Sequence, residues 1–80
     1  MNTGILVKNR ILELCEEHHI TVNKLCTICG ITQSTLNNIV NDKSQNPTIS
    51  TIKKICDGLN ITLCEFFNTD AFNESEQEIK

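Results

Sequence analysis

The sequence predicts a single all-α domain of five short helices. Apolar residues recur at the spacing of amphipathic helices, and no segment shows the strict alternation of a strand. Threonine stands directly ahead of four of these segments, where its hydroxyl can cap a helix. The chain has 80 residues, so we expect one domain whose helices share a thin core. No internal repeat is apparent in the sequence.

The first helix is expected to begin at about Thr3 or Gly4 and to end at Glu17. Its apolar residues fall at helical spacing and form one stripe that faces the interior. The members of this stripe are Val7, Ile11, Leu14 and Cys15. His18 and His19 follow the helix, near the negative end of its dipole, and we expect both to be solvated.

The second and third helices are expected over residues 22–29 and 33–41, with a tight turn between them. Thr21 caps the second helix, and Gly30 ends it because glycine adopts the left-handed conformation without a Cβ penalty. Thr32 caps the third helix. Two helices joined in this way present the second one as a protruding ridge.

Turn-forming residues fill segment 42–47, and two further helices are expected after it. Thr48 begins the fourth helix. Its expected inward face consists of Ile49, Ile52, Ile55, Cys56 and Leu59. The sequence Thr62-x-x-Glu65 is a capping box, which predicts a fifth helix over residues 63–68.

The charge distribution predicts a boundary near residue 69. The net charge is −3, and all of it lies in residues 70–80, because acidic and basic residues balance in residues 1–69. We therefore expect a folded domain over 1–68 and an acidic, flexible tail over 69–80. Such a tail could compete with an anionic partner for the basic residues of the domain.

The only aromatic residues are Phe66, Phe67 and Phe72. With no Trp or Tyr, the chain lacks a platform on which single-stranded bases could stack, which argues against RNA or single-strand binding. A domain of this size is not expected to bury all three phenylalanines. One or more of them is therefore expected to contact a second copy of the chain.

The five cysteines are odd in number and no leader precedes them, which favours a reducing cytoplasm over a disulfide framework. Cys26-x-x-Cys29 is compatible with a zinc or redox site, but both residues lie inside one helix, where free cysteine packs as a small hydrophobic residue. A zinc site needs four ligands, and no second pair is spaced for it. We expect no metal and no cofactor, and no apolar run reaches the ~20 residues that cross a bilayer.

The helix expected over 33–41 has one polar face. At roughly 100° per residue, its amide and hydroxyl side chains fall within an arc of about 140°. They are Gln33, Ser34, Asn37, Asn38 and Asn41, and Leu36, Ile39 and Val40 lie opposite. A ridge with a narrow polar face fits the DNA major groove, whose base edges present donors and acceptors.

Two segments in this register resemble the Cro and lambda-repressor type of helix-turn-helix domain, also called the XRE family. The first is ITVNKLCTICGITQSTLNNIVNDK, at residues 20–43, and the second is NPTISTIKKICDGLNITLCEFF, at residues 46–67. The resemblance covers residues 5–67. It implies a five-helix lambda-repressor-like fold, with the helix-turn-helix formed by the second and third helices.

The resemblance also implies a partner and a set of contacts. The partner is double-stranded DNA. Because a single recognition helix with so little charge would bind too weakly to be selective, we also expect a weak homodimer that forms through the region after the fifth helix. Residues at base-contacting positions are Gln33, Ser34, Asn37 and Asn38. Residues near phosphate-contacting positions are Thr32, Thr35, Lys43 and Thr48. Free N–H groups at the starts of the second and fourth helices can also hold phosphates.

The sequence departs from the family pattern at three places. Val22 stands where many members have a glutamine that touches DNA. Cys15 and Val40 stand where many members pair an Arg with a Glu, and an apolar pair can replace a buried ion pair at little cost. The recognition helix has no Arg or Lys, so affinity must depend on direct contacts and dimer avidity more than on counterion release.

These observations predict a sequence-specific DNA-binding regulator, most simply a transcriptional repressor. The alternative is a protein-interaction module of the same fold, such as an antitoxin that binds its toxin, because the recognition surface is nearly neutral. A third interpretation is a thiol or metal sensor that uses Cys26 and Cys29. The sequence shows no catalytic constellation, so we expect no enzyme activity and no small-molecule substrate.

Overall fold

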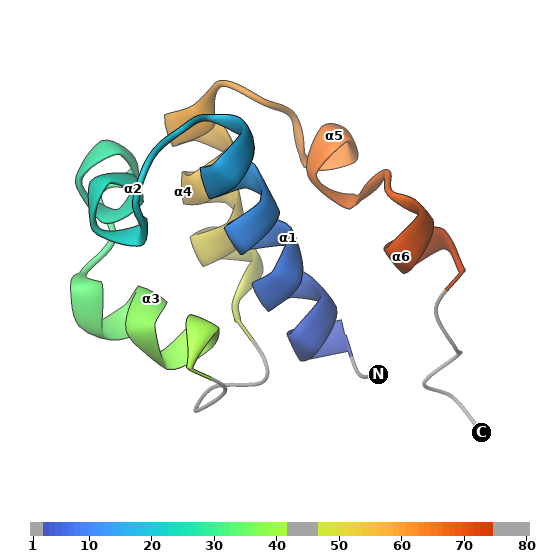
Figure 1. The fold of residues 1–80 in the computed structure, drawn as a ribbon, viewed down its shortest axis with the longest axis horizontal. Coiled ribbons are helices and arrows are strands. Elements are labelled where there is room, and N and C mark those ends of the chain that lie inside the picture. Colours follow the sequence, from blue (N-terminus) through green and yellow to red (C-terminus); the bar gives the residue numbers. More distant parts are fainter. Residues whose placement is uncertain (1–2, 42–46, 75–80) are drawn as a thin grey trace.

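A computed structural model describes residues 3–41 and 47–74 of the chain, and within these ranges it is all-helical. The helices are α1 (Thr3–Glu17), α2 (Val22–Cys29), α3 (Gln33–Val40), α4 (Ile49–Leu59), α5 (Leu63–Phe67) and α6 (Asp70–Asn73). Figure 1 shows α2 and α3 on one side of α1, with α5 and α6 on the other. The all-α fold with a helix-turn-helix is confirmed, and a sixth short helix is added to the five predicted.

Every helix after α1 begins with a threonine cap. The hydroxyl of Thr21, Thr32, Thr48, Thr62 or Thr69 accepts a hydrogen bond from the backbone N–H three residues later. At α5 the carboxylate of Glu65 also accepts from the Thr62 N–H at 3.1 Å, which completes the predicted capping box. Each such cap stabilises its helix by about 1 kcal/mol, and together the caps fix where the helices start.

Three helices end in the same turn, and a short repeat in the sequence marks each of these turns, so the expectation of no internal repeat was wrong. A residue in the left-handed conformation is followed by isoleucine and then by the next threonine cap. The three segments are His19-Ile20-Thr21, Gly30-Ile31-Thr32 and Asn60-Ile61-Thr62, with φ values of 55°, 67° and 59° at their first residues.

Each turn closes on a buried cysteine. The N–H groups of Ile20, Ile31 and Ile61 donate to the carbonyl oxygens of Cys15, Cys26 and Cys56, at 3.0, 3.1 and 2.9 Å. This six-to-one bond defines a Schellman turn, in which the residue after the left-handed position packs back on the helix. The same device therefore ends α1, α2 and α4 and directs the chain into the next helix.

One hydrophobic core joins the first five helices. Ile11, Leu25, Leu36, Ile55, Cys56 and Phe66 are its fully buried members. Helix α4 approaches α2 closely at Gly58, where an added Cβ would lie 2.3 Å from Cys29 Sγ and 3.0 Å from Cys29 Cα. Any residue other than glycine at position 58 would require α2 or α4 to move.

Ile49 differs from the expectation for the inward face of α4. It is 66 % exposed, whereas Ile52, Ile55, Cys56 and Leu59 are buried as predicted. Ile49 is the first residue of α4, ahead of the part of the helix that packs against α2. Helical spacing alone did not show that the buried part of α4 begins about one turn after the helix itself begins.

The chain after α5 packs against α1 in its described part. Helix α6 lies within the segment predicted as a flexible tail, and Phe72 packs against the core. Phe67 stacks edge-on against both Phe66 and Phe72, with ring centroids 4.8 and 5.0 Å apart. Only Phe66 is fully buried, whereas Phe67 and Phe72 stay partly exposed, so the expectation that this domain would not bury all three phenylalanines is confirmed. Helix α6 nevertheless brings Phe72 against the other two rings. Residues 75–80 lie outside the described ranges.

None of the helices in the described part of the chain combines the length and the apolar character needed to cross a bilayer.

Candidate nucleic-acid interface

Helices α2 and α3 form the predicted helix-turn-helix, and the turn between them sets their relative placement. Gly30 is left-handed, Ile31 is buried and Thr32 caps α3. On α3 itself, Leu36 and Ile39 are buried in the core. With its inner face buried in this way, α3 exposes the opposite face to solvent.

The outward face of α3 carries the predicted base-contacting residues. Gln33, Ser34, Asn37 and Asn38 are all exposed. No hydrogen bond joins their side chains to another residue within 3–41 or 47–74. Each amide offers one acceptor and two donors, and the Ser hydroxyl offers both functions. The face therefore presents donors and acceptors that are free to bind an external partner.

Two threonine pairs flank this face at helix starts. Thr32 Oγ1 accepts from the Thr35 N–H at 3.2 Å and donates to Thr35 Oγ1 at 2.8 Å, which leaves the Thr35 hydroxyl hydrogen to point outward. At α4, Thr48 Oγ1 accepts from the Thr51 N–H at 3.1 Å, and the two hydroxyl oxygens lie 3.0 Å apart. The predicted residues Thr32, Thr35 and Thr48 are thus all exposed, Thr32 and Thr48 as helix caps and Thr35 in the first turn of α3. Lys43 lies outside the described residues.

Two of the three departures from the family pattern, Val22 and the pair Cys15 and Val40, lie against the core. The third, the lack of Arg and Lys on α3, leaves the polar face of that helix without charge. Val22 and Val40 pack partly buried against the core, and Cys15 is 5 % exposed. No polar or charged residue is buried in the described part of the chain. The apolar pair predicted in place of an ion pair therefore leaves no stranded charge.

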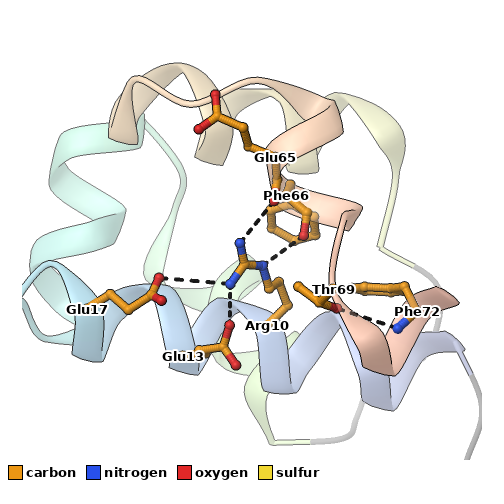
Figure 2. A network of polar contacts seen from close by, with 7 residues as sticks. All are labelled: Arg10, Glu13, Glu17, Glu65, Phe66, Thr69 and Phe72. Carbon is orange, nitrogen blue, oxygen red and sulfur yellow. Dashed lines mark hydrogen bonds and ion pairs between the residues drawn. The ribbon is translucent and has the colours of Figure 1, made fainter. Parts of the chain in front are cut away.

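Arg10 has a structural role that sequence reasoning missed. Its Nε donates to the Phe66 carbonyl at 2.7 Å and its Nη2 donates to the Glu65 carbonyl at 3.0 Å, so it satisfies the last turn of α5. Its Nη1 pairs with Glu13 and lies 3.9 Å from Glu17 (Figure 2). The only arginine of the chain is thus held against α5, and its side chain is only 12 % exposed.

The cysteines of the two-cysteine motif are core residues, as predicted. Cys26 and Cys29 are 4 % and 9 % exposed, and the Cys29 thiol points to the Ile55 carbonyl at 3.7 Å. Burial raises the pKa of Cys29 to about 11 and also raises the pKa of Cys15, Cys26 and Cys56. Within the described ranges, no three His, Cys, Asp or Glu side chains come together as metal ligands.

Charge is distributed unevenly over the described helices. Helices α2, α3 and α4 carry three lysines, Lys24, Lys53 and Lys54, against one acidic residue, Asp57. Helices α1, α5 and α6, with the adjoining Glu74, carry six acidic residues against Lys8 and Arg10. Within the described helices, positive charge is therefore in excess on α2 and α4, and negative charge is in excess on α1, α5 and α6.

The fold and this surface define a helix-turn-helix DNA-binding domain. Residues 10–71 match the family described as Cro/C1-type HTH DNA-binding domain, and the chain belongs to that family. It is also similar to a solved structure described as "Crystal structure of the prophage Lp1 protein 11", with 35% sequence identity and a TM-score of 0.82. That match covers 92% of this chain and 97% of the other. Among curated proteins, no significant match was found.

Proposed function

We propose that the protein is a transcriptional repressor that reads the major groove of double-stranded DNA with α3. One observation carries the proposal. The exposed face of α3 holds four amide or hydroxyl side chains without partners in the described structure, on a helix fixed by its buried face and by the Gly30 turn. A helix of this width enters the major groove, where base edges pair with such side chains.

The chemistry of this face predicts part of the target sequence. Gln and Asn pair with the N6 donor and N7 acceptor of adenine, whereas guanine is best read by Arg or Lys. Helix α3 has no Arg or Lys. We therefore propose that each half-site contains an adenine read by Gln33 or Asn38. Gln33 is the first choice because recognition helices place their N-terminal residues deepest in the groove.

Contacts to the DNA backbone are proposed for residues at the edges of α3 and α4. They are Thr32, Thr35, Lys43 and Thr48. Thr35 has the most direct support, because its hydroxyl accepts from Thr32 and keeps its own hydrogen available for a phosphate oxygen. We further propose that the chain acts as a homodimer and that it is located in the cytoplasm. We also propose that it acts by binding and not by catalysis. Its five free cysteines fit a reducing compartment.

The first experiment is selection of bound duplexes from a random pool, followed by titration of variants on the selected site. Gln33→Ala should cost roughly 1–3 kcal/mol and relax preference at one base pair. Lys43→Ala should weaken binding to all sequences alike and flatten the salt slope by about one unit. Asn73→Ala, which removes an exposed amide on α6, is the control and should change neither quantity. Unchanged affinity and preference for Gln33→Ala, with altered preference for Lys43→Ala, would refute readout by α3.

The second candidate function is a protein-interaction module, such as an antitoxin. It is favoured by the low positive charge of the helix-turn-helix side, where three lysines are offset by Asp57 and none lies on α3. DNA binding that weakens steeply with salt supports the regulator, because phosphate contacts release counterions. Failure of the random pool to yield any site would favour the protein module instead.

A further inference from the structure

A groove of about 170 Å³ lies between α1 and α6. Figure 1 shows α6 and α3 on opposite sides of α1. Its lining consists of Leu6, Asn9, Arg10, Glu13, Thr69, Ala71 and Phe72. Leu6 is buried although it stands outside the main core cluster, and Phe72 is partly buried. A cavity of roughly 150 Å³ with apolar walls accepts one benzene ring. The groove therefore has room for one aliphatic or aromatic side chain.

The surroundings of this groove are acidic. On α1, Glu13 lines it, and Glu16 and Glu17 continue the same helical stripe one turn further. On the other wall, Asp70 begins α6 and Glu74 follows its last residue. Arg10 adds little accessible positive charge, because its guanidinium is paired with two carboxylates and two carbonyls and is mostly covered (Figure 2).

We propose that this groove binds a segment of another protein that carries one apolar side chain flanked by Lys or Arg. The apolar lining selects the anchor side chain, and the acidic rim selects the flanking charges. Nucleic acid is repelled by the same rim. A second copy would bring an equally acidic α1–α5–α6 side, so like-charge repulsion makes it the poorer occupant. Because α3 lies on the far side of α1 from α6, the segment can bind while DNA is bound.

Titration of the ¹⁵N-labelled full chain with the capped peptide Lys-Arg-Leu-Arg-Lys at low salt tests the proposal. We expect chemical-shift changes centred on Asn9, Thr69, Ala71 and Phe72. The peptide Lys-Arg-Gly-Arg-Lys is the matched control and should bind about tenfold more weakly, because it lacks the apolar anchor. Ala71→Trp should fill the groove and reduce binding of the leucine peptide to the level of the glycine peptide.

Further variants separate the possible results. Glu16→Lys changes an exposed residue of the rim and should weaken the binding of both peptides. Asn23→Trp, on α2, should weaken the binding of neither peptide. Equal affinity for the two peptides, or full binding by Ala71→Trp, would overturn the proposal, because the peptide would then be held by charge alone. Concentration-dependent shifts of the same amides without peptide would overturn it in favour of a second copy. The peptide titrations contain no DNA, so their outcome is independent of the proposed reading of DNA by α3.

Discussion

At the scale of single residues, the same residue type has different roles according to its surroundings. Cys15, Cys26, Cys29 and Cys56 are buried hydrophobic residues, and three of them accept the closing bond of a Schellman turn through their carbonyls. Cys64, on α5, is exposed. A buried thiol in apolar surroundings is less acidic than a free one and is correspondingly inert. The four buried cysteines therefore stabilise the fold, and only Cys64 is accessible among the five.

The raised pKa of Cys29 predicts a loss of stability at alkaline pH. In the unfolded chain this thiol ionises near its ordinary value of 9.0, but in the folded protein it ionises at about 11. Below pH 9 the thiol is protonated in both states and its contribution to stability is fully present. Between pH 9 and 11 the unfolded state loses its proton first, so the free energy of unfolding falls.

Urea titrations at pH 8, 9, 10 and 11 measure this effect. The midpoint should fall more steeply with pH for the native sequence than for Cys29→Ala. Cys64→Ser is the control and should follow the native sequence, because Cys64 is exposed. Identical pH dependence for the native protein and Cys29→Ala would contradict the prediction.

The contacts of Arg10 predict that its substitution lowers the free energy of unfolding. Truncation by Arg10→Ala leaves the Glu65 and Phe66 carbonyls without their donor, so the free energy of unfolding should fall by about 2–3 kcal/mol. Arg10→Lys keeps the charge but not the planar fork, so it should recover only part of this loss. Urea titration measures both variants. Lys24→Ala, at an exposed position on α2, should change stability by less than about 0.5 kcal/mol. Native-like stability of Arg10→Ala would show that the cap is dispensable.

At the scale of helices, the sequence predicted what depends on near neighbours. The bounds of α2, α4 and α5 could be predicted because a threonine cap and a left-handed or polar end residue lie within a few positions of each helix end. The polar face of α3 could be predicted because its buried residues repeat at helical spacing. Both signals are local, and both are confirmed by the structure.

The features that were missed depend on contacts between distant parts of the chain. Arg10 and Phe66 are 56 positions apart, and the charge of Arg10 alone does not show that it meets the end of α5. In the sequence, Gly58 is only a residue with low helix propensity. Its role becomes visible only in the structure, where α2 packs closely against it. Helix α6 was missed because acidic residues dominate its composition, whereas Phe72 and the Thr69 cap determine its structure.

Substitution by alanine should therefore destabilise the protein at both Gly30 and Gly58, but for different reasons. Gly30 has φ of 67° but no atom within 4 Å of an added Cβ, so Gly30→Ala should cost only about 1–2 kcal/mol of backbone strain. Gly58→Ala brings a Cβ into contact with Cys29, and overpacking of this kind costs roughly 1–3 kcal/mol or more. Cys29→Ala should rescue part of the loss at Gly58 and none of the loss at Gly30. Urea titrations of the three single and two double variants measure the coupling, and equal coupling for both glycines would refute a specific contact.

At the scale of the whole molecule, the two sides of α1 have opposite electrostatic character. The helix-turn-helix side has a small excess of lysine, and the α1–α5–α6 side has a larger excess of acid. If α3 contacts DNA as proposed, we expect this polarity to favour the orientation in which α2 and α3 face the phosphates. The excess of lysine is small, however, so a single domain gains little from counterion release.

Weak binding by one copy predicts that two copies act together on DNA. Two copies related by a two-fold axis can place their α3 helices in successive major grooves about 34 Å apart on a palindromic site. We expect the chain to be largely monomeric when free, because the acidic sides around α5 and α6 repel each other, and to bind the selected duplex as two copies. Sedimentation of the free protein should show association that strengthens with added salt, as expected for like charges that are screened. Binding to DNA should instead weaken with salt. A single bound copy at saturation, together with monomers at every salt concentration, would show that the domain recognises its site alone.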